Sequence, residues 1–368
     1  MGRDFAGRMK GIFAYTFLDR HGNTISSQNG QMPLMPASNM KIVTGYAAYR
    51  TLGKAFKFRT NFSLEGQTVN VTGDPTPLLS GPTLQEIINQ LASKEGQIEN
   101  ANFMSEAIDN NPYVPSWELD DRKYTYQAKI TPFSVNEGSV PRGNGEVELA
   151  KLVNPHGTEH KPSRNPLRLF EHAIKNASAS GVAGGSSDST SERVEHIESL
   201  PEVISHMETV SCNFTAELLQ KYLGHRATGR KGSWRYGTKA VLDLLKKLDL
   251  DVDGIAIADG SGLSRMNLLK TDLLAGLIHT ISQNGDSDFL NLLPSPGKGT
   301  ISKRLENLSH LGIHAKTGSI GYCASLTGYM DKPGVSFSVI INHSTEPGKD
   351  LPTHIDSFLG EMARKFQW

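Results

Sequence analysis

The stretch PASNMKIVTGYAAYRTLG, residues 36–53, decides how the rest of the chain is interpreted. Its apolar residues predict a buried helix from Ser38 to Leu52, and Gly53 supplies a helix stop. Ser38 and Lys41 are three residues apart near the start of this helix, so their side chains are expected on the same face. Packing alone does not require a hydroxyl beside an amine, which makes the pair a candidate for chemistry.

Ser38 and Lys41 have the residue types of a nucleophile and its base. A serine hydroxyl is a weak nucleophile until a base removes its proton. A lysine can be that base only if its pKa falls well below about 10.4, and burial or a second nearby cation lowers it. The positive end of the helix dipole would also favour negative charge developing on Ser38. The same spacing recurs at residues 295–298, but a proline and a glycine there prevent a helix.

A second motif, Lys316-Thr317-Gly318, occurs once and follows a predicted short strand over residues 312–315. A lysine and a threonine hydroxyl at this place can hold a carboxylate. Gly318 would let a substrate backbone approach the strand edge. These residues are therefore predicted to bind the end of a peptide.

A third motif, Ser211-Cys212-Asn213, lies between the other two and directly precedes a predicted helix over residues 214–223. Ser-x-Asn is a weak signal alone, because it also occurs at residues 27, 134, 163 and 282. Its position before a helix, and between the other motifs, selects the copy at Ser211.

The composition describes a globular chain without a general affinity for polyanions. Among 368 residues, 38 are Lys or Arg and 38 are Asp or Glu, which gives no overall attraction to nucleic acid or an anionic membrane. No apolar run reaches the length of a membrane span, and the N-terminus has no signal-peptide pattern. We expect a cytoplasmic protein, or one whose export signal was removed. The two cysteines, Cys212 and Cys323, allow one bridge or two free thiols.

The pattern of strands and helices indicates an α+β fold. Strands are expected near both ends of the chain with helices between them, so that one sheet would be closed by the termini. Residues 111–166 contain seven prolines and favour irregular structure, and residues 176–192 have the composition of a linker or of a surface loop. The expected strands lie at residues 13–19, 57–71, 314–316, 323–330 and 335–342, and the expected helices at 38–52, 84–91, 214–223, 236–248, 271–281 and 351–366.

The three motifs, in their order along the chain, resemble the active-site set of penicillin-binding proteins and serine β-lactamases. The flanking sequences narrow the resemblance to the D-alanyl-D-alanine carboxypeptidase/endopeptidase family S13, the class C low-molecular-mass penicillin-binding proteins. It extends over nearly the whole chain. The sequences that carry it are PASNMKIVTGYAAYRTLG, VTGDPTP, VSCNFTAELLQKYLG, IADGSGLSRMNLL, PSPGKGTISKRL and HAKTGSIGYCASLTGYM.

This resemblance implies a penicillin-binding transpeptidase/β-lactamase-like fold, an antiparallel sheet flanked by helices. It also implies a smaller, mostly-β accessory domain inserted between the motif at Ser38 and Lys41 and the motif at Ser211–Asn213. We expect the main domain over residues 1–67 and 167–368, and a reduced insertion over residues 68–166. The segment at 176–192 would then lie on the edge of the main domain.

The resemblance also implies a role for each motif residue. Ser38 would be acylated, Lys41 would be its base, and Ser211 would relay the proton to the leaving amine. Asn213 would bind the substrate amide, while Lys316 and Thr317 would hold its terminal carboxylate. The backbone N–H groups of Ser38 and Ser319 would form the oxyanion hole.

A looser resemblance places Trp117, Asp120 and Tyr126 in a pocket for the diamino acid of the substrate, although packing of the insertion explains them equally well. One departure is Cys212, since the family usually has Asp between the serine and the asparagine. That residue normally points away from the substrate, so we expect activity to survive.

The implied function is cleavage of a D-alanyl-D-alanine peptide, such as a peptidoglycan stem peptide, through an acyl-enzyme that β-lactams trap, without metal or other cofactor. The balance of carboxypeptidase and endopeptidase activity, the exact peptide and the oligomeric state stay open. Alternatives are a β-lactamase, a D-specific aminopeptidase or esterase, and a non-catalytic peptide-binding module. Residues 156–160 (HGTEH) match a zinc-peptidase pattern, but the prolines and glycine around it oppose the helix that zinc binding needs.

Overall fold

The computed structural model describes residues 10–95, 98–141, 160–162, 170, 173–174 and 193–368. The chain divides into two compact units. The first comprises Met1–Thr51, Ile204–Cys212 and Thr238–Trp368, and the second comprises Leu52–Val203 and Asn213–Gly237. The segment predicted as a linker, residues 176–192, lies outside the described residues. Within the described ranges, no helix combines the length and the apolar character that crossing a membrane requires.

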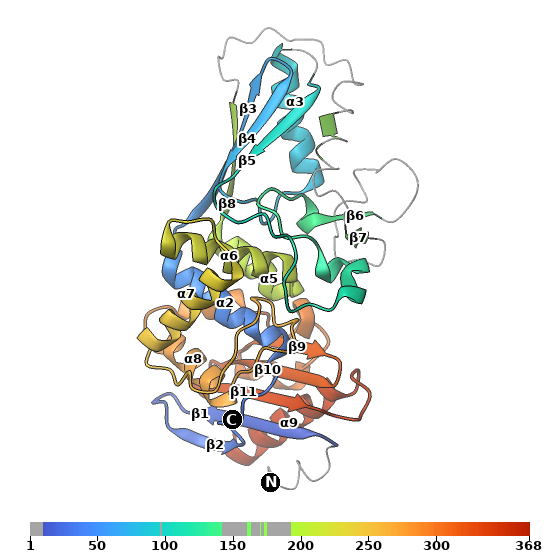
Figure 1. Ribbon diagram of the computed structural model, residues 1–368. Helices are drawn as coiled ribbons and strands as arrows, with labels where there is room; N and C mark the ends of the chain where they lie inside the picture. Colours follow the sequence, from blue (N-terminus) through green and yellow to red (C-terminus); the bar gives the residue numbers. More distant parts are fainter. Residues whose placement is uncertain (1–9, 96–97, 142–159, 163–169, 171–172, 175–192) are drawn as a thin grey trace. The chain divides into compact units, whose positions relative to one another are not determined.

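The first unit is built on a five-stranded antiparallel sheet in the order β2-β1-β11-β10-β9 (Figure 1). Its strands are β1 Ile12–Leu18, β2 Thr24–Gln28, β9 Ile313–Ile320, β10 Cys323–Met330 and β11 Val335–Asn342. Its helices are α2 Met40–Leu52, α8 Thr271–Gln283 and α9 Leu351–Phe366, with parts of α5 Leu200–Val210 and α7 Trp234–Lys247. Strand β1 pairs with β11, so the sheet joins the two ends of the chain. The predicted α+β fold is therefore confirmed.

One face of this sheet is apolar and carries α9. Successive side chains of a strand point to opposite faces, and every second residue of β1 and β11 is a large hydrophobe. These residues form one buried core with the apolar side of α9. The side chains concerned are Phe13, Tyr15, Phe17, Phe337, Val339, Ile341, Ile355, Phe358 and Leu359.

The opposite face is lined by small polar side chains. Strands β10 and β11 place Ser325, Thr327, Ser336 and Ser338 there, all at most 1% exposed. Thr16 on β1 faces the same way, and its Oγ1 lies 3.0 Å from Oγ1 of Thr271 at the start of α8. A buried hydroxyl needs a hydrogen-bond partner. The hydroxyl groups of this face can therefore bind backbone atoms of the segments that pack on it.

The second unit has its own sheet, in the order β5-β4-β3-β8, with a parallel pair between β4 and β5. Helix α3 and the sheet share a hydrophobic core. The elements are β3 Lys57–Glu65, β4 Thr68–Gly73, α3 Gly81–Glu95, β5 Asn100–Met104, β6 Ser139–Pro141, β7 His160–Pro162, β8 Arg193–Ser199 and α6 Asn213–Thr228. This unit is wider than the insertion expected over residues 68–166, and the limits of that insertion stay a prediction.

Two local predictions were wrong in detail. Residues Ala37–Asn39 form a short 3-10 helix and α2 begins at Met40, so Ser38 lies in the turn before the α-helix. Positive φ at Ala37 (46°) produces this turn. The Lys-Thr-Gly motif lies inside β9 rather than after a shorter strand. Helix α5, which leads to Ser211, was not predicted.

Candidate active site

The first pair of predicted site residues comes together in the first unit. Lys41 is fully buried, and its Nζ lies 3.1 Å from Oγ of Ser38. The same Nζ donates a hydrogen bond to the carbonyl oxygen of Ser261 at 2.8 Å. Ser38 is partly exposed. A reachable hydroxyl beside a buried amine is the arrangement that nucleophilic catalysis by serine requires.

The turn that carries Ser38 is fixed to the polar face of the sheet. Ser325 Oγ donates to the carbonyl oxygen of Pro36 at 2.7 Å, and Asn39 Nδ2 donates to Oγ1 of Thr327 at 2.7 Å. Asn342 on β11 accepts the backbone N–H of residue 35 at 2.8 Å. The strands therefore hold the backbone on both sides of Ser38.

Gly318 in β9 allows this turn to approach the sheet. A Cβ on Gly318 would collide with the side chain of Ser325 and would lie 2.8 Å from the carbonyl oxygen of Pro36 and 3.0 Å from Cβ of Ala37. The glycine was expected to admit a substrate backbone. The structure gives it a further reason, which is close packing of the segment before Ser38.

The turn Asp259–Gly262 supports Lys41 through the carbonyl oxygen of Ser261. The carboxylate of Asp259 is fully buried and accepts hydrogen bonds from the N–H groups of Gly262 (2.7 Å) and Ser264 (2.6 Å). Gly262 has φ of 82°, and a Cβ there would collide with Ala37. This DGSG stretch lies in one of the sequences that carry the family resemblance, and none of its residues was predicted to be in the site. Its contribution is the backbone carbonyl that Lys41 binds.

The second and third motifs also meet in the first unit. Lys316 on β9 is fully buried, and its Nζ donates to Oγ of Ser211 at 3.0 Å. Thr317 Oγ1 donates to Oγ1 of Thr300 at 2.7 Å. Ser211 has φ of 60°, a left-handed conformation that ends α5 and turns the chain toward α6. Ser319 is exposed on the same strand as Lys316.

Burial and neighbouring charges shift the ionisation of this site. Burial, and then the charge of Lys41, lower the pKa of Lys316, and the carboxylate of Glu208 opposes that shift. Glu208 lies on α5 and is fully buried, which raises its pKa against the influence of both lysines. Sequence analysis missed Glu208, because no motif marks a glutamate three residues before Ser211.

Four predicted site residues lie in the second unit. Asn213 begins α6, and its Nδ2 donates to the carbonyl oxygen of Tyr126 at 3.0 Å. The Tyr126 ring is 38% exposed and stacks on Tyr124, with 5.2 Å between the ring centroids. Asp120 is exposed, whereas Trp117 is only 8% exposed. Burial and a hydrogen bond to the Asp121 carboxylate raise the pKa of Tyr126 to about 12, so its hydroxyl stays protonated at neutral pH.

With this geometry established, comparison with known proteins identifies the family. The D-Ala-D-Ala carboxypeptidase 3 (S13) family model matches residues 6–193 and 158–362. The chain belongs to the S13 family. It is therefore a member of a family of serine peptidases.

Individual relatives agree with this assignment. The chain is 26% identical over 415 residues to a D-alanyl-D-alanine carboxypeptidase of Actinomadura sp. (strain R39). The aligned region covers 89% of this chain and 76% of the relative. Its fold is similar to penicillin binding protein 4 of Haemophilus influenzae, with TM-score 0.80, 19% identity and 98% of each chain covered. A penicillin G-acylated predatory endopeptidase of Bdellovibrio bacteriovorus gives TM-score 0.57 at 15% identity, covering 96% of this chain and 92% of that one.

Cys212 is the departure from the S13 pattern. Its side chain is fully buried, and neither Cys212 nor Cys323 is in a disulfide. The backbone N–H of Cys212 donates to the carbonyl oxygen of Met207 at 3.0 Å, which closes the end of α5. The expectation that Cys212 points away from the substrate stays a prediction.

The zinc pattern HGTEH lies mostly outside the described residues. Its last member, His160, begins strand β7, which pairs with β6. Zinc binding by this pattern would need a helix, so the strand at His160 opposes the alternative of a zinc peptidase.

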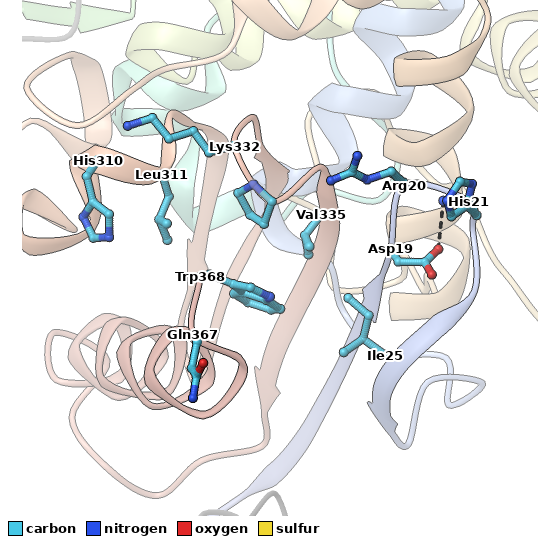
Figure 2. Close-up of a pocket in the computed structure, with 11 residues that line it drawn as sticks. Asp19, Arg20, His21, Ile25, His310, Leu311, Lys332, Val335, Gln367 and Trp368 are labelled. Atoms are coloured by element: carbon cyan, nitrogen blue, oxygen red, sulfur yellow. Dashed lines mark hydrogen bonds between the residues drawn. The ribbon is translucent and has the colours of Figure 1, made fainter.

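A pocket of about 470 Å³ lies in the first unit, apart from the motif residues (Figure 2). It is bounded by the turn after β1, the turn between β10 and β11, and the end of the described chain. Trp368 and Val335 supply apolar walls, and Arg20 and Lys332 supply positive charge. None of its lining residues belongs to the three motifs, so we do not assign the chemistry to this pocket.

Proposed function

We propose that this S13 member is a serine-type D-Ala-D-Ala carboxypeptidase that works through an acyl-enzyme on Ser38. The observation that carries the proposal is the distance of 3.1 Å between Lys41 Nζ and Ser38 Oγ, with Lys41 fully buried. A neutral amine at this distance can take the hydroxyl proton as the oxygen attacks a carbonyl carbon.

The later steps use the other motifs. Ser211 passes the proton from Lys41 to the amine of the departing D-alanine, and the 3.0 Å contact with Lys316 supports an orientation of its hydroxyl for this transfer. Lys316 and Thr317 bind the terminal carboxylate, and Asn213 binds a substrate amide. The N–H groups of Ser38 and Ser319 stabilise the tetrahedral oxyanion. Water then hydrolyses the ester on Ser38.

The substrate class that fits this assignment is a peptidoglycan stem peptide, and an enzyme that acts on it would work outside the cytoplasm. β-Lactams would acylate Ser38 as substrate analogues. The name of the Actinomadura D-alanyl-D-alanine carboxypeptidase supports a D-alanyl-D-alanine peptide as substrate, and the penicillin G-acylated Bdellovibrio enzyme supports acylation by β-lactams. Trp117, Asp120 and Tyr126 are proposed to contact the side chain of the substrate diamino acid.

The experiment that tests the proposal is mass spectrometry of the intact protein after incubation with benzylpenicillin, followed by mapping of the adduct. We expect one adduct on the peptide that contains Ser38, and none in Ser38→Ala. Hydrolysis of an acylated lysyl-D-alanyl-D-alanine peptide should stop in the same variant while its melting temperature is kept. Peptide hydrolysis that persists in folded Ser38→Ala would refute the nucleophile.

The remaining outcomes separate the alternatives. Rapid turnover of benzylpenicillin without a lasting adduct would indicate a β-lactamase. Peptide binding with neither adduct nor turnover would indicate a binding module. Cleavage of a cross-linked dimer peptide, compared with the monomer, measures the share of endopeptidase activity.

A further inference from the structure

The carboxylate of Glu208 is buried beside the two lysines without a partner of its own. Glu208 is 0% exposed, and neither of its carboxylate oxygens has a hydrogen-bond partner in the described part of the chain. A polar group in this state costs folding free energy, and a charged one costs more. Such a group is most easily explained if its charge acts on something nearby.

Helix packing shows what Glu208 faces. Gly45 is one helical turn after Lys41 on α2, so the two residues share a face. A Cβ on Gly45 would lie 3.0 Å from Oε1 of Glu208. Glycine inside a helix costs about 1 kcal/mol relative to alanine. Its presence here leaves room for the carboxylate of α5 against the side of α2 that carries Lys41.

The charged groups that act on Glu208 come from two elements, Lys41 on α2 and Lys316 on β9. In return, the carboxylate of Glu208 raises the pKa of Lys316, against burial and the charge of Lys41. The acid and the two amines therefore titrate as a coupled set. A single carboxylate can balance one ammonium, and the repulsion between two ammonium groups disfavours a second.

We propose that Glu208 is a positioning residue for catalysis, whose charge keeps one ammonium and one free amine in the site. The two amines share one proton, and the form with the ammonium on Lys316 and the neutral amine on Lys41 is the one that binds the substrate carboxylate and accepts the proton of Ser38. This inference rests on the proposed function, because it assigns the two lysines the roles given there.

The deciding variant is Glu208→Gln, which keeps the side-chain size and removes the charge. An opposite charge within about 4–6 Å shifts a pKa by about 1–3 units. We therefore measure the rate of acylation by benzylpenicillin as a function of pH. In Glu208→Gln, the alkaline limb of this profile should move about 1–3 pH units lower, and the acid limb should move in the same direction. Glu208→Asp keeps the charge and should restore the limbs toward their original pH.

Glu202→Gln is the matched control, since Glu202 is exposed on the same helix and the change in charge is equal. Its pH profile should be that of the unaltered enzyme. If the acylation rate of Glu208→Gln is lower at every pH but both limbs stay at their original pH, the proposal is overturned and Glu208 is a packing residue. If Glu208→Gln fails to fold, Glu208→Met provides the same test, because it removes the same charge and leaves an apolar side chain of similar length.

A titration of the lysine ε-carbons by NMR separates this inference from the proposed function. The Lys316 signal, assigned by its loss in Lys316→Met, should titrate at lower pH in Glu208→Gln than in the unaltered protein. That shift would support the charge coupling even if benzylpenicillin failed to modify Ser38. An unchanged Lys316 titration would refute the coupling whatever the enzyme's activity.

Discussion

At the scale of single residues, the burial of Lys316 limits the pH range in which the site can hold a carboxylate. Burial and the charge of Lys41 lower the pKa of Lys316. Only the protonated amine attracts a carboxylate, and a lowered pKa means that this proton is lost as pH rises, well below the ordinary lysine value near 10.4. The affinity for free-carboxylate peptides should therefore weaken at mildly alkaline pH.

The measurement is KM against pH for a peptide with a free terminal carboxylate and for its methyl ester. KM of the free acid should rise with pH while that of the ester changes little. Parallel curves for the two substrates would mean that the charge of Lys316 does not bind the carboxylate.

Removing Lys316 should discriminate between the same two substrates. A charge-assisted hydrogen bond contributes about 1.5–3 kcal/mol, so Lys316→Ala should lower kcat/KM for the free acid about 10–100-fold more than for the ester. A circular dichroism spectrum identical to that of the parent protein would show that the variant is folded. An equal loss for both substrates would point instead to the contact between Lys316 and Ser211.

Lys41→Ala tests the base. We expect acylation by benzylpenicillin to fall by about 10²–10⁴-fold, the usual contribution of a positioned proton acceptor. The affinity for a peptide that cannot be cleaved should change far less, since Lys41 is assigned to the proton rather than to binding. Acylation within a few-fold of the parent rate would exclude Lys41 as the base.

At the scale of elements, the close approach of the Pro36–Ala37 turn to β9 is a contact that a single methyl group would disturb. In Gly318→Ala, the new Cβ would lie 2.8 Å from the backbone oxygen of Pro36, which cannot move aside as a flexible side chain can. Overpacking of this kind costs about 1–3 kcal/mol and should displace Ser38. We expect a lower melting temperature and much slower acylation.

The matched control is Gly348→Ala, where a Cβ would meet nothing within 4 Å. It should leave both the melting temperature and the acylation rate unchanged. If Gly318→Ala behaves like the control, the close approach of turn and strand does not control the position of Ser38.

The elements that sequence predicted best are those whose patterns are complete within one segment. Strands β10 and β11 and helix α9 begin and end at the predicted residues, because the apolar pattern that marks each element is contained in its own segment. The Ser-Lys pair was also predictable, because its spacing is local. The turn at Ser38 was not, since it depends on hydrogen bonds to Ser325 and Thr327 almost 290 residues away.

Glu208 shows the corresponding limit for the site. In the sequence it is an ordinary polar residue of a helix, and nothing nearby marks it as buried. Its environment arises only when α5 packs on Gly45 of α2 and the chain brings Lys316 to the same place. The roles of Trp117, Asp120 and Tyr126 depend on a bound substrate and stay predictions.

At the scale of the whole molecule, the two thiols offer a simple test of packing. Cys212 and Cys323 are both buried and neither is in a disulfide, and burial raises the pKa of Cys323 to about 12. Reaction needs an accessible thiolate. A thiol reagent should therefore label neither cysteine in the native protein and both in denaturant, and a reducing agent should leave the melting temperature unchanged. Rapid labelling of the native protein would contradict this packing.

The pairing of β1 with β11 also has a consequence for biosynthesis. Ser38 leaves the ribosome early, whereas Asn342, which binds the backbone just before it, is made some three hundred residues later. Contacts of such long separation form slowly and late. The nascent chain must therefore carry Ser38 without this support until Asn342 has been translated. The reactive centre can acquire its geometry only when the last strand of the sheet arrives.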